Sequence, residues 1–147
     1  MKFRMVDRIT SFRPRESICG TKTVSFEEYE LKAALADEPR LPESLLMESL
    51  FQLGNWLIVL SSDFSQMGLL VRIEEAQFRG PVPPGRSIQM DIRVKRYRSD
   101  GILFDGRACI GEDVVAVGSG CLATCVPLCE YHDPSDLKVL FSEIYRP

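Results

Sequence analysis

The segment that most constrains the fold of this chain runs from Leu41 to Leu60, with the sequence LPESLLMESLFQLGNWLIVL. It opens with Pro42, and proline is favoured in the first turn of a helix because the N–H that it lacks would have no partner there. From Leu45 onward, apolar residues occupy almost every side of such a helix. A helix that is apolar on nearly all sides is buried. The segment therefore predicts a core helix.

Four polar residues interrupt this apolar helix at helical spacing. Ser44, Glu48, Gln52 and Asn55 are separated by four, four and three residues, which places them along one line of the helix. A charged carboxylate is rarely buried without a partner or a function. Two interpretations fit this stripe. It is either the narrow wet edge of a packed helix, or Glu48 faces a ligand cavity or a subunit interface.

Length and composition indicate one soluble globular domain over residues 1–147. The net charge is −3, and no basic block indicates a nucleic-acid partner. Glu43, Glu48 and Gln52 would be costly in a bilayer, so the long apolar segment is interpreted as a core helix and no membrane contact is expected. No apolar stretch typical of a signal peptide follows Met1–Met5, which favours the cytoplasm.

The sequence implies neither a metal nor another cofactor. The five cysteines form no C-x-x-C pair, and His132 is the only histidine, so a zinc site is poorly supported. In the cytoplasm, such cysteines are more often small buried residues than disulfide partners. The chain also has no glycine-rich phosphate loop and no dinucleotide-binding fingerprint.

Strand patterns lie on both sides of the long helix. Residues 17–26 are rich in β-branched side chains, and strict alternation from Ile88 to Lys95 predicts a half-buried strand. A loop with three prolines, Gly80–Gly85, cannot be helical. Before these strands, residues 12–16 predict a turn-like break. After the long helix, strands are expected at 69–78, between the turns at 99–101 and 111–113, and at 114–125. A short helix is expected at 136–144, and residues 133–135 mark its start.

This layout predicts an α+β hot-dog fold, in which an antiparallel sheet wraps around one long buried helix. The order is strand, long helix, then four or more antiparallel strands in a meander. A flat sheet cannot cover a helix that is apolar on all sides. We therefore expect the sheet to curl and a second subunit to complete the cover.

Several short motifs occur in an order that resembles a known family. They are MVDRI at 5–9, GTK at 20–22, LLMESLFQ at 45–52 after a proline, and FRGPVPPG at 78–85. The ordered set resembles the FabA/FabZ-type 3-hydroxyacyl-acyl-carrier-protein dehydratases, roughly over residues 3 to 126. The C-terminal segment 131–147, a tail and helix, lies outside this resemblance.

The resemblance implies a homodimer with a hydrophobic tunnel between its subunits. Its partners would be acyl carrier protein or acyl-CoA thioesters, in fatty-acid or related lipid or polyketide synthesis. The family dehydrates (3R)-3-hydroxyacyl thioesters to trans-2-enoyl thioesters with a histidine and a glutamate from opposite subunits. The histidine takes the α-proton and the carboxylic acid assists the departing hydroxyl. Glu48 matches the glutamate.

The start of the helix and the loop before it carry the remaining roles that the resemblance implies. A backbone N–H at a helix N-terminus polarises the thioester carbonyl. The substrate-binding positions are Ala34, Leu35, Pro42, Glu43, Ser44 and Gln52.

The chain departs from the family pattern at two of these positions. The histidine of the family falls on Ala34, and the glycine at the helix start falls on Glu43. A carboxylate suits a helix N-terminus but opposes a developing oxyanion. Tyr29, Asp37 and Glu38 lie near the missing histidine and could supply another acid or base, whereas His132 in its polar turn is expected on the solvated surface.

Three functions remain open from the sequence. The chain is a divergent dehydratase or another hot-dog thioester enzyme that uses Glu48, or a non-catalytic acyl-binding protein or partner subunit of an active dehydratase, or a scaffold without a ligand. In a mixed dimer, the partner chain would supply the histidine. Several basic residues could dock a carrier protein, but basic residues are equally expected at solvated strand edges. They are Arg79, Arg86, Lys95, Arg96 and Arg98.

Overall fold

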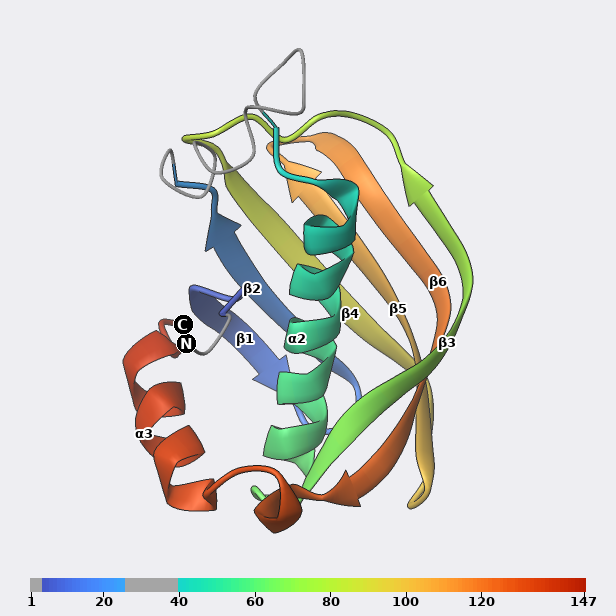
Figure 1. Ribbon diagram of the computed structural model, residues 1–147, viewed down its shortest axis with the longest axis vertical. Helices are drawn as coiled ribbons and strands as arrows, with labels where there is room; N and C mark the ends of the chain where they lie inside the picture. Colours follow the sequence, from blue (N-terminus) through green and yellow to red (C-terminus); the bar gives the residue numbers. More distant parts are fainter. Residues whose placement is uncertain (1–3, 26–39) are drawn as a thin grey trace.

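A six-stranded antiparallel sheet curves around one long helix (Figure 1). The computed structural model describes residues 4–25 and 40–147. The sheet order is β1-β2-β4-β5-β6-β3. This arrangement is the α+β architecture that the sequence predicts. The elements are β1 (Arg8–Arg13), β2 (Ser17–Thr23), α2 (Glu43–Ser61), β3 (Gln66–Phe78), β4 (Ser87–Tyr97), β5 (Gly101–Ile110), β6 (Asp113–Pro127), the 3-10 turn η2 (Leu128–Glu130) and α3 (Pro134–Ile144).

The helix α2 is the core helix that its apolar sequence predicts. By length and composition alone it could cross a membrane, but more than half of it is buried against the sheet. Gly54 allows this close packing, because a Cβ atom there would lie 2.8 Å from Cζ of Phe104 on β5. The residues of α2 that are buried are Leu46, Met47, Ser49, Leu50, Leu53, Gly54, Leu57, Ile58 and Val59.

The position of β3 differs from the predicted meander. Strands β4, β5 and β6 do form a meander, but β3 pairs with β6 at the far edge of the sheet. The physical reason is the connection after β3, since the proline-rich loop Gly80–Gly85 cannot form the tight hairpin that neighbouring strands would need. The chain instead crosses from one edge of the sheet back to its middle (Figure 1).

The predicted break at residues 12–16 is also partly wrong. Strand β1 continues to Arg13, and only residues 14–16 form the turn. The strand extends because Phe12 pairs with Ile18 of β2, and its ring packs against the core. Tertiary pairing therefore overrides the turn-like local sequence.

The C-terminal segment returns to the side of α2 that the sheet does not cover. Asp133 caps α3, because its Oδ1 atom accepts hydrogen bonds from the backbone N of Ser135 at 2.9 Å and from its Oγ at 2.6 Å. These bonds lower the pKa of the Asp133 carboxyl. At the other end, Tyr145 bridges to Ile9 of β1, and the backbone N of Arg146 donates to the Ile9 carbonyl at 2.9 Å. Thus α3 lies beside α2 on the β1 side of the sheet, away from β3 (Figure 1).

All five cysteine thiols are free. Cys121 is buried on β6, and this burial raises the pKa of its thiol to about 11, so it stays protonated at neutral pH. Cys129, on η2, is exposed.

Candidate functional site

Two hollows meet at the polar stripe of α2. The first, named here the α3 compartment, lies between α2 and the C-terminal segment and has a volume of about 360 Å³. The second, the β3 compartment, lies between α2 and β3 and has a volume of about 350 Å³. Glu48, Gln52 and Asn55 line both. The other residues of the α3 compartment are Arg4, Val6, Trp56, Val59, Leu128, His132, Leu137, Leu140 and Ile144, and those of the β3 compartment are Phe51, Ile58, Gly68, Leu69, Leu70, Phe104 and Ala123.

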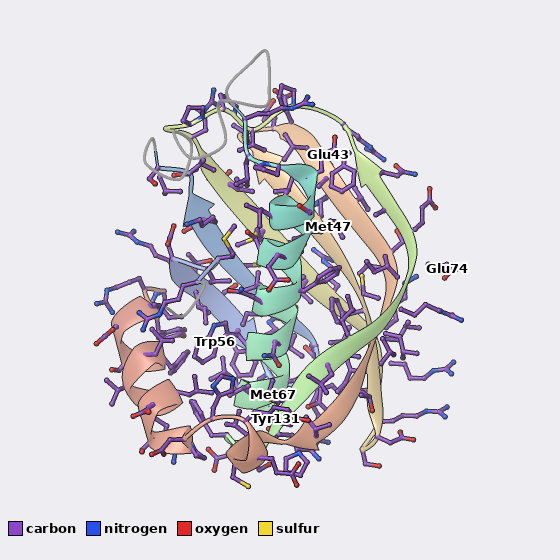
Figure 2. All side chains as sticks on the ribbon, viewed as in Figure 1. Glu43, Met47, Trp56, Met67, Glu74 and Tyr131 are labelled. Carbon is purple, nitrogen blue, oxygen red and sulfur yellow. The ribbon has the colours of Figure 1, made fainter. Side chains whose placement is uncertain are left out.

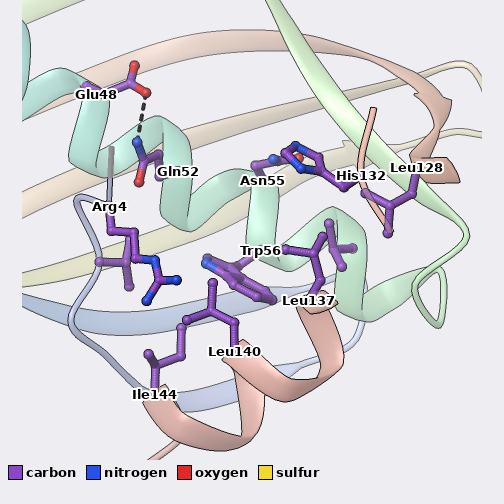
Figure 3. A pocket seen from close by; sticks show the side chains of 12 residues that line it. Arg4, Glu48, Gln52, Asn55, Trp56, Leu128, His132, Leu137, Leu140 and Ile144 are labelled. Carbon is purple, nitrogen blue, oxygen red and sulfur yellow. Dashed lines mark hydrogen bonds between the residues drawn. The ribbon is translucent and has the colours of Figure 1, made fainter. Parts of the chain in front are cut away.

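Hydrogen bonds fix the orientation of the stripe. Gln52 accepts from the backbone N of Met5 at 2.8 Å through Oε1, so its Nε2 points the other way and donates to Oε1 of Glu48 at 3.0 Å (Figure 3). Asn55 accepts from the backbone N of Gly68 at 2.7 Å, which ties the start of β3 to the helix. Glu48 is therefore a half-buried carboxyl group in a fixed orientation, at the border of two mainly apolar spaces.

His132 lies at the opposite end of the α3 compartment from Glu48. Figure 3 shows the carboxylate at one end and the imidazole at the other, near Asn55 and Leu128. Glu48 and Asn55 are seven residues apart, which is about 10 Å along the helix axis. An acid and a base that act on one substrate must both lie within hydrogen-bonding reach of the reacting atoms. His132 of the same chain is thus too far along the helix to pair with Glu48.

The environment of His132 is only partly the one that its sequence predicts. The residue is exposed, as expected for a polar turn, but it also lines the compartment wall. The position could not be read from the sequence, because it depends on where α3 docks.

The residues at the start of α2 lie more than one helical turn from Glu48. Pro42 precedes the helix, and its carbonyl accepts from the backbone N of Leu45 and of Leu46 at 3.0 and 3.1 Å. Glu43 and Ser44 are exposed in the first turn, where Figure 2 shows Glu43 at the N-terminal end of α2. Glu43 lines a crevice of about 240 Å³ whose other residues are Arg40, Leu41, Leu46, Phe78, Arg79, Gly80, Pro81 and Val82.

The loop before α2 falls outside the described residues. This includes the predicted substrate-binding residues Ala34 and Leu35, and also Tyr29, Asp37 and Glu38. Within residues 4–25 and 40–147, the titratable side chains that line the α3 compartment are Arg4, Glu48 and His132. The same part of the chain contributes only Glu48 to the β3 compartment.

The basic residues considered for carrier docking separate into two groups. Arg79 and Arg86 flank the proline-rich loop near the start of α2. Lys95, Arg96 and Arg98 lie at the other end of β4, where Lys95 pairs with Asp105 at 3.1 Å and the two arginines line a groove with Val71, Asp100, Gly101, Leu103, Leu122, Ala123 and Thr124. The two groups therefore do not form one patch.

Comparison with solved structures defines the fold class. The fluoroacetyl-CoA thioesterase FlK superposes with a TM-score of 0.67 at 12% identity, over 88% of this chain and 96% of FlK. A hot-dog-like protein from Thermanaerovibrio acidaminovorans gives a TM-score of 0.65 at 17% identity, over 88% of this chain and 91% of that protein. The chain therefore has the hot-dog fold predicted from its sequence.

Sequence comparison identifies the family. The family model described as the FabA-like domain matches residues 1–119. The 3-hydroxyacyl-[acyl-carrier-protein] dehydratase FabZ of Caulobacter sp. strain K31 is 35% identical over 117 residues, which cover 78% of this chain and 72% of that protein. This chain belongs to the FabZ-type dehydratase family within the FabA-like domain. The end of β6, η2 and all of α3 lie beyond the matched region.

Proposed function

We propose that this chain binds the acyl group of acyl-carrier-protein thioesters and, on its own, dehydrates 3-hydroxyacyl thioesters only weakly. The observation that carries this proposal is the position of Glu48, a carboxyl group oriented by Gln52 at the border of two mainly apolar compartments. The described part of either compartment supplies no second acid or base near it. Ala34 stands where the family resemblance puts the histidine, and losing a general base typically lowers a rate about 10²–10⁴-fold.

In this proposal each end of the site has a separate role. Glu48 contacts the 3-hydroxyl group and donates to it as it departs. The first turn of α2 binds the thioester carbonyl through its free backbone N–H groups, with Pro42 and Ser44 as neighbours of the carbonyl. Glu43 weakens this second interaction, because its carboxylate opposes negative charge on the carbonyl oxygen. Ala34 and Leu35 complete the substrate-binding residues.

The test is an assay of the purified protein with a trans-2-enoyl thioester, followed by loss of the enoyl absorbance on hydration. We expect binding, seen as a rise in melting temperature with thioester concentration, but slow turnover. Glu48→Gln should remove the remaining turnover, whereas Glu143→Gln, the same change on an exposed helix position, should not. Fast turnover that depends on Glu48 would contradict the proposal that the site lacks a general base. Tyr29, Asp37 and Glu38 would then be tested as the base. Absence of thioester binding would contradict the proposal as a whole.

We also propose that the protein is a homodimer in the cytoplasm, and the edge strand β3 supports the homodimer. Its outer edge carries unpaired backbone groups, and Leu69 and Val71 are 37% and 60% exposed. Such an edge pairs readily with another strand. We propose that β3 of a second copy pairs there and closes the β3 compartment. A heteromer with an active dehydratase is the second candidate, favoured by Ala34, because that partner would supply the histidine.

Val71→Lys should weaken this dimer. A lysine at this edge would lose part of its hydration when a second strand pairs there, which we expect to raise the dimer dissociation constant by roughly tenfold or more. Light scattering during gel filtration measures the change in mass. Val139→Lys is the matched control, because Val139 is 59% exposed on α3. A monomeric wild type would refute the homodimer, and a mixed complex formed with an added FabZ-type dehydratase would identify the heteromer instead.

A further inference from the structure

The β3 compartment is closed at one end, where β3 begins beside the C-terminal end of α2. Figure 1 shows β3 starting there and diverging from the helix toward the far edge of the sheet. The contact at the closed end is tight, because a Cβ atom at Gly68 would lie 2.5 Å from Cδ1 of Ile58 and 3.2 Å from Cβ of Ala123. The compartment therefore narrows away from Glu48 and ends where Gly68 meets Ile58.

Two contacts hold this closed end in place. Asn55 of α2 accepts a hydrogen bond from the backbone N of Gly68 at 2.7 Å, which keeps the start of β3 against the helix. Ile58 is 1% exposed and packs directly against Gly68, so its side chain has little room to move aside. The end of the compartment is therefore a fixed wall, whereas its side lies open at the strand edge where the proposed second copy binds.

The path from Glu48 to this wall suits an unbranched acyl chain. Phe51 of α2, Leu70 of β3 and Phe104 of β5 line it, and all three are apolar. The amides beside the path are engaged in the hydrogen bonds described above. Glu48 and Ile58 are ten residues apart, which is about 15 Å along the helix axis. Ligand sites of this kind are typically apolar with a few polar groups that fix orientation.

We infer that Ile58, held beneath Gly68, stops the acyl chain of the substrate and so sets the longest chain that the protein accepts. This inference rests on the proposed function, in which Glu48 contacts the 3-hydroxyl group, and it adds a specificity-determining residue. Each methylene group buried before the wall strengthens binding about fourfold, whereas a chain that reaches past Ile58 must fold back or push the wall aside. The α3 compartment is a poorer place for the chain, because the charged side chain of Arg4 and the imidazole of His132 line it.

Two substitutions of one residue test the inference. The dissociation constants of saturated acyl-pantetheine thioesters, from butanoyl to hexadecanoyl, are measured by calorimetry. Ile58→Ala removes three carbon atoms from the wall, so the first chains beyond the wild-type limit should bind about fourfold or more tighter, with little change for butanoyl. Ile58→Val removes a single methyl group and should move the limit less in the same direction. It also keeps the test valid if the alanine variant does not fold.

Two further variants separate the outcomes. Leu53→Ala removes the same number of carbon atoms from a buried position that faces Gly20 of β2, and it should leave the length profile unchanged. Leu140→Trp fills the α3 compartment instead. If the limit stays the same in both Ile58 variants, or if Leu140→Trp alone shortens it, the inference is wrong while the proposed function stands. If the wild-type protein binds none of the thioesters, the proposed function fails as well.

Discussion

Ala34→His is expected to raise the rate at which this protein dehydrates 3-hydroxyacyl thioesters by about 10²–10⁴-fold, the usual contribution of one general base. The chain is 35% identical to a FabZ dehydratase, and the resemblance puts the histidine of the family at this position. In the proposed function Glu48 is the other half of the acid–base pair, and Gln52 already orients its carboxyl group. The comparison of kcat/KM for wild type and variant, with a 3-hydroxyacyl thioester as substrate, measures the gain.

The same gain should vanish in Ala34→His combined with Glu48→Gln, because dehydration needs both the base and the acid. Ala33→His is the positional control, since it adds an imidazole at the neighbouring residue. Adding Glu43→Gly should raise the rate further, because it removes the carboxylate that opposes charge on the thioester carbonyl. If none of the histidine variants is faster than wild type, the missing base is not what limits the activity.

The core of the fold could be predicted because it is encoded locally. The apolar segment from Leu41 to Leu60 predicts the helix to within two residues at each end, and Pro42 marks its start. The alternation after Gly85 likewise predicts β4. The place of β3 could not be predicted, since its residues alternate like those of any other strand and its pairing with β6 depends on contacts about fifty residues apart.

The candidate site was predictable on α2 and not beyond it. Spacing along one helix places Glu48 beside Gln52, and their hydrogen bond follows from it. The wall that α3 contributes could not be located this way. The apolar residues Leu137, Leu140 and Ile144 recur at helical spacing, which indicates that one face of the helix packs against the rest of the protein. That this face lies against α2 follows from tertiary contacts, namely the docking of Phe141 on Trp56 and the bridge from Tyr145 to β1.

The two sides of α2 should respond differently to the same substitution. Leu53 faces the sheet with 0% exposure, and its Cδ1 atom would lie 3.0 Å from a Cβ atom at Gly20, so the packing there is tight. Leu53→Ala should therefore lower the free energy of unfolding by about 2–5 kcal/mol, the range for deleting a leucine from a rigid core. Leu140 is only partly buried and borders a hollow, so Leu140→Ala should cost about 1 kcal/mol or less.

Urea denaturation of both variants, followed by tryptophan fluorescence, compares the two costs directly. A large cost at Leu53 with a small one at Leu140 means that packing against the sheet supplies the stability and that α3 adds little. Adding an acyl thioester should also raise the midpoint of the Leu53 variant as it does for wild type, since ligand binding stabilises the folded state by mass action. Equal costs at the two positions would mean that α3 packs as part of the core.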